Sequence, residues 1–514
     1  MTSRMGYHGR ISVRGWRAVS GALAVGALLL SAAIAVRAQE APSYTVINTF
    51  AGTGADGAYP RAKLIRDQAS NLFGTTFNGG NLNECFGAGC GVVFKVDRLG
   101  KETVLYNFKG GADGAYPIAG LVPDDAGNLY GTTEGGGDVN GDASCAEFEG
   151  FPGCGVVFKL DPTGKQTVLH AFTGGADGLG GSSSLVRDEA GNLYGVTVAG
   201  GFSGDCPGLP LPGCGVVYKL DPKGSETVLH AFTGGADGYG PYGDLLLDAA
   251  GDLYGAAGYG GDLSGFCSDV VEPATGFLGC GTVFKLDRTG KFTVLHTFNG
   301  ADGAIADGWL VQDNAADLYG MTGNGGDLSG CSGLGCGAVF KVDRTGKETV
   351  LYRFTGGADG AETFAGVVRD AAGNLYGTTA FGGDFSGSLC AGTGCGVAFK
   401  LSPTGKETVL YTFTGGADGV NPGTSLLQDE EDNLYGTTIG GGDTSSCSPT
   451  YGCGVVFKIA LHDGGDPDAS REGVAAAADE TTEGPRVVLP ENAQKLLQQR
   501  RGFGRLGTPL TGSR

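Results

Sequence analysis

The sequence predicts an all-β fold, a seven-bladed β-propeller with four antiparallel strands in each blade. A unit of 56 to 66 residues, marked by a Gly-Cys-Gly or Cys-Gly frame, recurs seven times between residues 85 and 457. Each unit contains four short runs rich in Val, Phe, Tyr, Leu and Thr, bounded by turn residues, as strands are. Gly supplies 101 of 514 residues without the three-residue period of collagen, which fits many tight turns. Units of this length and strand content are typical of propeller blades.

The unit at residues 102–160 shows the order of the elements. A strand at 102–108 is followed by an Ala-Asp-Gly connection, a short apolar run that ends at Asp124, a second strand around Leu-Tyr-Gly-Thr-Thr, a cysteine loop and the run Val-Val-Phe-Lys-Leu. Residues 161–164 and 188–192 read as tight hairpins, because an Asp can bond the backbone two residues on and a Gly can adopt the left-handed conformation.

The two ends of the repeat array complement each other. Residues 44–50 repeat the pattern of the strand at 102–108, and the last unit stops at Ile459 without that strand. We therefore expect the N-terminal strand to complete the seventh blade and to close the ring. An open solenoid is the alternative, and it would need capping units that the sequence lacks.

These motifs resemble the GloVer (Gloeo/Verruco) tandem repeat proteins, which are secreted bacterial chains. The resemblance rests on Leu-Tyr-Gly-Thr-Thr at 129–133 with Val-Val-Phe-Lys-Leu at 156–160, and on their counterparts at 375–379 and 399–401. It covers residues 44–460 and implies an exported, propeller-like protein without an assigned biochemical role. The C-terminal tail departs from the family pattern, since it shows no apolar anchor.

By analogy with other propellers, the strand ending in Asp124 or Asp188 should be innermost and the Thr-Val-Leu strand outermost. The two tight hairpins then lie on one face of the ring. The Ala-Asp-Gly connections and the cysteine loops lie on the other.

The fourteen cysteines form seven local pairs with none left over, which predicts disulfides and an oxidising compartment. A zinc site is the alternative for the C-x4-C pairs, although no second pair or histidine lies nearby. Each disulfide closes a short loop and contributes on the order of 2 to 3 kcal/mol in the chain-entropy model. The expected pairs are Cys85 and Cys90, Cys145 and Cys154, Cys206 and Cys214, Cys267 and Cys280, Cys331 and Cys336, Cys390 and Cys395, and Cys447 and Cys453.

The termini differ from the repeats. Residues 1–38 have the basic start, the small apolar run and the Val-Arg-Ala end of a signal peptide, with an uncleaved membrane anchor as the alternative. We expect the propeller at 39–460, in an exported protein that is periplasmic, cell-surface or extracellular. Residues 461–514 read as a disordered linker with a short basic tail, whose role is a docking segment or a frayed end.

Charge restricts the partners. The formal net charge is -20 and falls to -25 once the leader is removed. Nucleic acid and anionic membrane surfaces both require Lys and Arg to neutralise phosphate, so neither is an expected partner. We expect a monomer with no membrane span in the mature chain, and a glycan or an envelope protein as its partner.

The Ala-Asp-Gly aspartates are candidate ligand-binding residues. Because each precedes an innermost strand, we expect a closed ring to place them around one mouth of the central channel, where they would attract Ca²⁺. The alternative is that each Asp caps its own turn, with the following Gly at positive φ. These residues are Asp56, Asp113, Asp177, Asp237, Asp302, Asp359 and Asp418.

The cysteine loops vary from unit to unit, which is where a scaffold places recognition. Asp138, Asn140 and Asp142 alternate oxygen ligands as some calcium loops do, but they lack the remaining positions of an EF-hand. Aromatic loop residues such as Phe266 either stack on sugar rings or plug the space beneath the loops.

Catalytic motifs are not evident. His170, His230 and His296 share a position with Tyr106, Tyr352 and Tyr411, which indicates packing rather than acid-base chemistry. We therefore favour an exported propeller scaffold that binds a ligand or partner through the face carrying the disulfide loops, without catalysis. The alternative function is a carbohydrate-active hydrolase or lyase using loop carboxylates, with calcium assistance. A purely structural envelope component is a third hypothesis.

Overall fold

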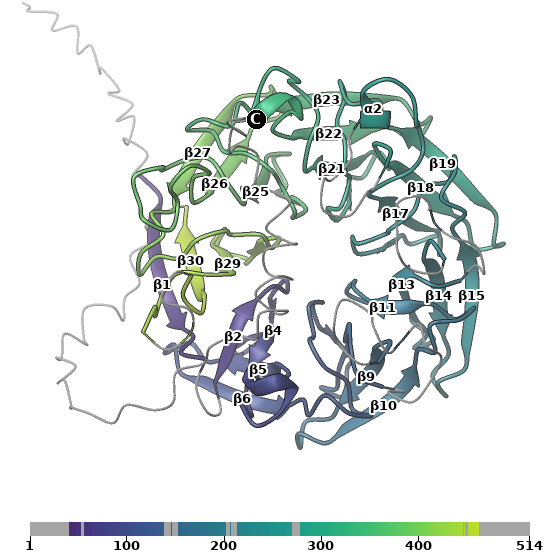
Figure 1. The fold of residues 1–514 in the computed structure, drawn as a ribbon, viewed down its shortest axis with the longest axis vertical. Helices are drawn as coiled ribbons and strands as arrows, with labels where there is room; N and C mark the ends of the chain where they lie inside the picture. Colours follow the sequence, from purple (N-terminus) through teal and green to yellow (C-terminus); the bar gives the residue numbers. More distant parts are fainter. Residues whose placement is uncertain are drawn as a thin grey trace, which may run out of the picture. The chain divides into compact units, whose positions relative to one another are not determined.

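The computed structural model of the chain describes residues 41–52, 56–137, 145, 153–201, 206, 213–269, 278–445, 447 and 451–461. These residues form seven antiparallel sheets, each with the same run of four strands. Figure 1 shows the sheets arranged in sequence order around a ring, as blades of a propeller. The predicted fold class is confirmed. The predicted leader and almost all of the predicted tail lie outside the described residues.

The innermost strand of each blade is only two residues long and ends directly before the aspartate of a tight turn. The predicted strand order is therefore confirmed. These strands are β3 (Ile65–Arg66), β7 (Val122–Pro123), β12 (Val186–Arg187), β16 (Leu246–Leu247), β20 (Val311–Gln312), β24 (Val368–Arg369) and β28 (Leu427–Gln428).

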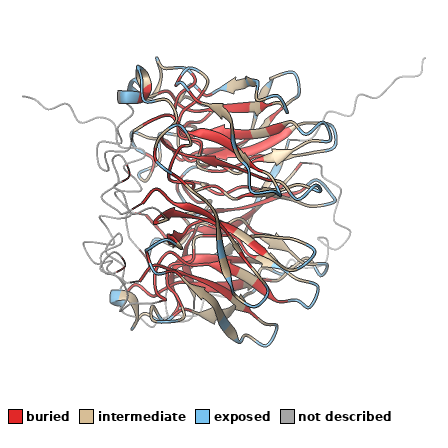
Figure 2. Ribbon diagram, turned by 90° about the vertical axis from the view of Figure 1, so that its right-hand side faces the viewer, coloured by how far each residue is buried: buried red, intermediate tan, exposed pale blue. Residues whose placement is uncertain are grey.

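The second and third strands form the buried middle of each blade. The second strands are β4 (Leu72–Gly79), β8 (Leu129–Thr132), β13 (Leu193–Ala199), β17 (Leu253–Ala257), β21 (Leu318–Thr322), β25 (Leu375–Thr379) and β29 (Leu434–Thr438). The third strands are β5 (Val92–Val96), β9 (Val156–Leu160), β14 (Val216–Leu220), β18 (Thr282–Leu286), β22 (Ala338–Val342), β26 (Val397–Leu401) and β30 (Val455–Ala460). Figure 2 shows that buried residues are concentrated in the strands and exposed residues in the turns.

The outermost strands carry the Thr-Val-Leu pattern and pair with the third strands. Each pairing contains a register shift, as between Val93 and Phe94 opposite β6. These strands are β1 (Ser43–Thr49), β6 (Glu102–Asn107), β10 (Gln166–Ala171), β15 (Glu226–Ala231), β19 (Phe292–Thr297), β23 (Glu348–Arg353) and β27 (Glu407–Thr412). Two further strands, β2 (Gly57–Pro60) and β11 (Leu179–Gly181), extend the sheets of β4 and β13.

The first strand pairs with the last. β1 runs antiparallel to β30, with Tyr44 opposite Ile459 and Thr49 opposite Val455. The seventh sheet therefore has the order β1, β30, β29, β28. That this pairing is what holds the ring closed stays a prediction.

The tight hairpins have the predicted chemistry. Asp161 Oδ1 accepts the backbone N–H groups of Thr163 at 2.9 Å and Lys165 at 3.0 Å, and Gly164 has a φ of 84°. Because the strands alternate in direction, both hairpin types of a blade lie on one face. The cysteine loops and the connections between blades lie on the other.

The core consists of apolar side chains between adjacent sheets. Phe108, which follows β6, packs edge-on against Phe158 of the next blade, with the ring centroids 5.2 Å apart. The same contact joins Phe50 to Phe94 and Phe413 to Phe457. Since these rings are fully buried, the blades are held together mainly by apolar burial.

A backbone hydrogen bond also joins every pair of neighbouring blades. In each case a residue in the left-handed conformation donates its N–H to the carbonyl of the second cysteine in the preceding blade. The bond from Tyr59 to Cys453 joins the first blade in the sequence, blade 1, to the last, blade 7. Non-Gly residues adopt this conformation at an energetic cost. The donors are Tyr59, Tyr116, Gly180, Gly240, Ile305, Glu362 and Asn421.

Candidate functional site

The disulfides lie on the face with the cysteine loops, under the connections between blades. All seven predicted pairs are confirmed. A Cβ added to Gly110, in the connection after β6, would lie 2.6 Å from Cys85 Sγ and 2.9 Å from Cys90 Sγ. The disulfides therefore support the connections that carry the Ala-Asp-Gly aspartates.

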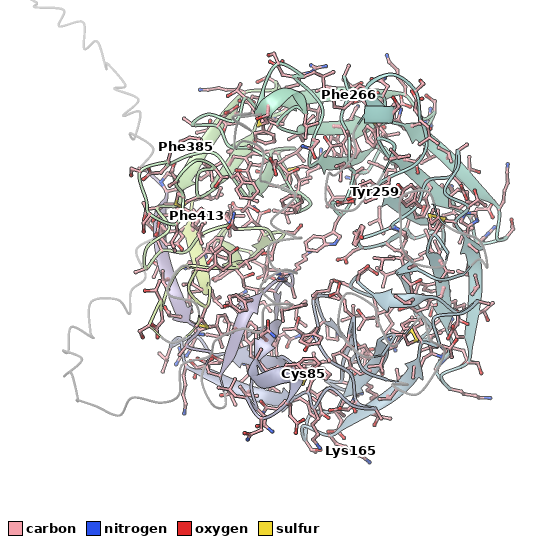
Figure 3. All side chains as sticks on the ribbon, in the orientation of Figure 1. Cys85, Lys165, Tyr259, Phe266, Phe385 and Phe413 are labelled. Carbon is pink, nitrogen blue, oxygen red and sulfur yellow. A yellow bond between two sulfur atoms is a disulfide. The ribbon has the colours of Figure 1, made fainter. Side chains whose placement is uncertain are left out.

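Short helical turns and aromatic side chains occupy the described parts of these loops. Two 3-10 turns (Cys85–Gly87 and Cys331–Gly333) and α2 (Phe266–Asp269) begin at or next to a first cysteine. The Phe266 ring packs against Gly300 of the following connection, so it acts as a plug beneath the loop. Phe385 is 45% exposed and Phe86 is 60% exposed. Figure 3 shows Phe266 and Phe385 on the loops between strands.

The Ala-Asp-Gly aspartates do not surround the centre of the ring, so that expectation is wrong. Six of them accept a hydrogen bond from the Tyr or His of their own outermost strand, as Asp113 does from Tyr106 at 2.8 Å. Asp56 instead accepts the N–H groups of Ala51 at 2.5 Å and Gly57 at 2.7 Å. The physical reason is that each Asp stands at the start of the connection, where the outermost strand ends, and the chain reaches the centre only afterwards.

The alternative reading of these aspartates, as turn caps, agrees with the hydrogen bonds. Asp177 accepts the N–H of Thr173 at 3.0 Å and its hydroxyl at 2.5 Å, and Gly178 has a φ of 100°. Burial raises the pKa of Asp177, but the hydrogen bonds from His170 and Thr173 lower it by a larger amount. The pKa is therefore below its ordinary value. His and Tyr alternate in this position because either side chain donates to the carboxylate. Ligand binding by these aspartates stays a prediction.

Each aspartate also meets the next blade. Its neighbour there is the residue that precedes the Thr-Val pair of the next outermost strand, which we call the seam residue. Tyr44 donates its hydroxyl to the Asp418 carbonyl at 2.6 Å, and Gln166 donates to the Asp113 carbonyl at 3.0 Å. The seam residues are Tyr44, Glu102, Gln166, Glu226, Phe292, Glu348 and Glu407.

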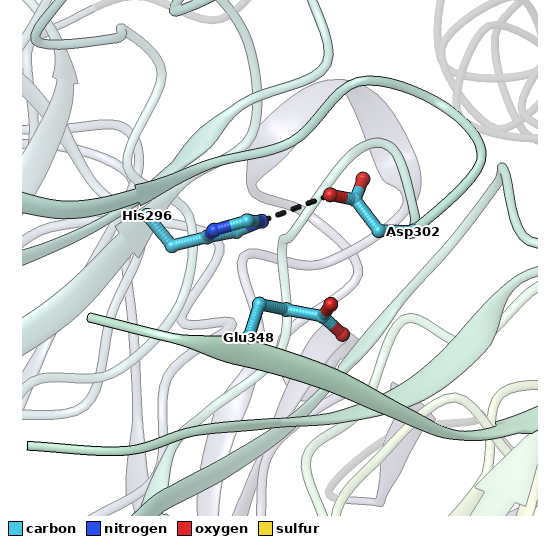
Figure 4. A group of neighbouring side chains, drawn as sticks. All are labelled: His296, Asp302 and Glu348. Carbon is cyan, nitrogen blue, oxygen red and sulfur yellow. Dashed lines mark hydrogen bonds and ion pairs between the residues drawn. The ribbon is translucent and has the colours of Figure 1, made fainter. Parts of the chain in front are cut away.

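We call the junction of two neighbouring blades at a seam residue a seam. At the seam of Glu348, a histidine and two carboxyl groups lie close together. Figure 4 shows His296 bonded to Asp302 at 3.1 Å, with Glu348 beside them. Their ligand atoms lie within 4.8 Å of one another. An open depression of about 490 Å³ adjoins them, and Lys347 and Arg353 also line it. Because these cations oppose a bound cation and Tyr replaces the His in three other blades, we assign no metal ion here. Calcium binding stays a prediction, and Asp138, Asn140 and Asp142 lie outside the described residues.

The centre of the ring carries a set of residues that the sequence reasoning missed. The position four residues before the aspartate of each inner hairpin differs from blade to blade, and we call these residues the inner positions. The flanking positions are uniform, with a buried Leu or Val on one side and a buried small residue on the other. The inner positions are Lys63, Gly120, Ser184, Asp244, Trp309, Gly366 and Ser425.

The inner positions contact one another around the ring. Gly120 N–H donates to Ser184 Oγ at 2.8 Å, Ser184 N–H donates to Asp244 Oδ1 at 2.5 Å, and Gly366 N–H donates to Ser425 Oγ at 2.7 Å. A Cβ at Gly366 would lie 2.6 Å from the Trp309 carbonyl oxygen. Adjacent blades therefore meet at these positions, where they present different side-chain chemistry.

Asp244 is the unusual ionisable group of this set. Burial raises its pKa to about 6, although hydrogen bonds from Ser184 and Trp309 and the attraction of Lys63 lower it. A carboxyl group of this kind changes charge near neutral pH. Blade-to-blade variation within an otherwise repeated unit was the signal that could have found it.

Comparison with known proteins agrees with the repeat pattern. A model of the Gloeobacter/Verrucomicrobia repeat matches residues 142–387 and 271–448. The chain belongs to this repeat family. The resemblance seen in the sequence is therefore confirmed. None of the curated proteins matches the chain in sequence.

Solved structures similar to this Gloeobacter/Verrucomicrobia repeat protein are distant. A gluconolactonase from Xanthomonas campestris is 13% identical, with a TM-score of 0.35 over 65% of this chain and 85% of that one. A luciferin-regenerating enzyme is 17% identical, with a TM-score of 0.35 over 66% and 90%. A fungal alcohol oxidase of the AA5 family, in complex with copper, is 16% identical, with a TM-score of 0.44 over 81% and 75%. These likenesses carry no information about activity.

Proposed function

We propose that the protein is an exported propeller scaffold that binds a ligand or partner at the centre of the ring and on the face with the disulfide loops. Seven disulfides support an oxidising compartment. Among the described residues, no helix has the length and apolar character needed to cross a membrane. A glycan or an envelope protein is the partner that suits this location.

One observation carries the proposal. The inner positions place an ammonium group, a carboxyl group, an indole and two hydroxyls within a ring of blades that share one strand pattern. For folding, the side chains at these positions need only fit between neighbouring blades. Gly or Ser meets that requirement in four of the seven blades. Lys63, Asp244 and Trp309 are therefore best explained by recognition, since aromatic and charged groups set the orientation of a ligand.

Binding is tested with a panel of polysaccharides and an envelope extract on immobilised protein. We expect Trp309→Ala and Lys63→Ala to weaken retention of the bound glycan or protein about tenfold or more, which corresponds to about 1.4 kcal/mol. Leu99→Ala, at an exposed hairpin on the opposite face, is the matched control and should bind as the wild type does. Equal binding by all three variants would contradict the proposed site.

The loops offer a second test of the same function. Exchanging the loop of Cys331 and Cys336 for that of Cys390 and Cys395 should change binding while leaving the melting temperature of the ring nearly unchanged. The two loops have equal spacing between cysteines, so the closed ring of atoms has the same size. Unchanged binding with an intact fold would remove this face from the site.

A second candidate function, carbohydrate hydrolysis or lysis, is favoured by Asp244. A carboxyl group with a pKa near 6 can donate a proton to a leaving group at neutral pH. The same polysaccharide panel, incubated with and without a chelator, measures turnover. Turnover that Asp244→Asn abolishes would establish an enzyme, whereas binding without turnover would support the scaffold.

A further inference from the structure

Four of the seven seams bring two carboxyl groups together. The seam residues Glu102, Glu226, Glu348 and Glu407 each face the Ala-Asp-Gly aspartate of the adjoining connection. In all four, Oε1 is buried and has no hydrogen-bond partner. A buried carboxylate oxygen without a donor is costly, and a second negative charge beside it adds repulsion. These four glutamates are therefore poorly placed to be ionised.

The remaining three seams show which chemistry the position requires. Gln166 and Tyr44 donate hydrogen bonds to the adjoining connection, and Phe292 stacks on His230 with the ring centroids 3.7 Å apart. All three side chains are neutral. A protonated Glu is also neutral, has nearly the shape of Gln and can donate to a carboxylate as Gln donates to a carbonyl.

The aspartates, in contrast, already accept several hydrogen bonds. Asp359 accepts hydrogen bonds from the Tyr352 hydroxyl at 3.0 Å, the Thr355 N–H at 2.9 Å and the Thr355 hydroxyl at 2.6 Å. These donors stabilise the ionised form. We therefore place the proton on the Glu, whose Oε1 receives no hydrogen bond.

We propose that these glutamates carry a proton in mildly acidic medium and act as pH-sensitive joints between blades, so that the ring loosens as the pH rises through neutrality. The trait belongs to the seams and does not depend on the proposed ligand. An exported protein meets a changing external pH, and all four joints would respond in the same direction.

The groups that surround each joint favour the same behaviour. Burial is the main cause that raises the pKa of Glu407, to about 7, and Asp359 adds to it. Burial and Asp302 raise the pKa of Glu348 to about 7, while His296 and Arg353 oppose the rise. Lys347 also lines the depression beside Glu348. Tyr352 is the other titratable group that faces Glu407.

At the two remaining joints the pKa of the Glu is raised as well. Burial and Asp56 raise the pKa of Glu102, against a hydrogen bond from Asn48 of β1. Burial raises the pKa of Glu226, with His170 lowering it and Asp177 raising it again. Tyr218 of β14 also faces Glu226.

The sign of the effect follows from linkage. An unfolded Glu ionises near pH 4.5, whereas the folded Glu407 ionises near pH 7. The folded chain therefore binds more protons between these values, and its stability falls as the pH rises through this window. The contribution is fully present below about pH 4.5 and is lost above about pH 7.

The test compares melting temperatures at pH 5 and pH 8. The variant E102Q/E348Q/E407Q carries at three seams the residue that the chain itself uses at Gln166. We expect its melting temperature to fall less than that of the wild type between the two pH values, by on the order of several degrees. Glu430→Gln, on an exposed hairpin, is the control and should follow the wild type. Equal pH dependence of wild type and triple variant would overturn the proposal.

A reciprocal variant keeps the test informative if the triple variant folds poorly. Gln166→Glu creates a fifth carboxyl pair with Asp113 and should make the melting temperature fall more steeply with pH. Infrared spectra of Glu-labelled protein at pH 6 should show a protonated carboxyl band that weakens in Glu407→Gln. A missing band in the wild type, or an unchanged slope for Gln166→Glu, would also contradict the proposal.

Discussion

At the scale of single residues, the outer rim illustrates how one interaction is repeated with different side chains. Tyr352 donates its hydroxyl to Asp359 at 3.0 Å, and His230 bonds Asp237 at 3.2 Å in the same position of another blade. What the position requires is a ring that packs on the core Phe and a donor that reaches the carboxylate. Packing alone, which the sequence suggested, explains only half of this requirement.

The donor requirement can be tested by changing one atom. Tyr352→Phe removes only the hydroxyl and should lower the free energy of unfolding by about 1 kcal/mol, since the bond is partly exposed. Tyr352→His should cost less, because His170, His230 and His296 make the same bond. Chemical denaturation of the two variants measures both values. A Tyr352→His variant that is less stable than Tyr352→Phe would argue for packing alone.

At the scale of elements, the disulfide loops connect neighbouring blades. The second cysteine of each loop offers its carbonyl to a left-handed residue of the next blade, as Cys336 does to Glu362 at 2.9 Å. Fixing the loop therefore also fixes a hydrogen bond between blades. This explains why the cysteine pairs recur although the loops between them vary.

Removal of one disulfide should have a local effect and a moderate global effect. Cys331→Ala combined with Cys336→Ala should lower the free energy of unfolding by about 2 kcal/mol, from the short loop that the bond closes. Hydrogen exchange should become faster at the Glu362 amide and stay unchanged at the Tyr116 amide, whose acceptor is Cys90. Equal exchange rates of the Glu362 amide in the wild type and the double variant would show that the disulfide does not stabilise this hydrogen bond between blades.

The elements were largely predictable from the sequence because each blade repeats the same local signals. The Asp and Gly of the hairpin at 161–164 determine a turn through their own side chain and φ, so no distant contact is needed. The sequence wrongly placed the Ala-Asp-Gly aspartates at the centre of the ring. Their position depends on the path of the connection, as after Asp113, and local sequence patterns do not contain that path. Asp244 was missed because its hydrogen-bond partners, Ser184 and Trp309, belong to two other blades.

At the scale of the whole molecule, seven similar blades carry different side chains where they meet at the centre. The core contacts between aromatic rings and the backbone bonds to cysteine carbonyls are shared by all junctions between blades, including the one between the seventh and the first. Tyr44 adds a stack on Tyr411 with centroids 3.8 Å apart. The N-terminal strand thus makes the contacts that a seam needs, and we expect its pairing with β30 to close the ring.

Hydrogen exchange along β1 measures this closure directly. If β1 closes the ring, the amides of residues 45–49 that pair with β30 should exchange as slowly as those of β6, and deletion of residues 43–50 should speed exchange in β29 and β30 as well. Exchange of the β1 amides at the rate of an unstructured chain, while β6 stays protected, would show that the ring does not depend on its first strand.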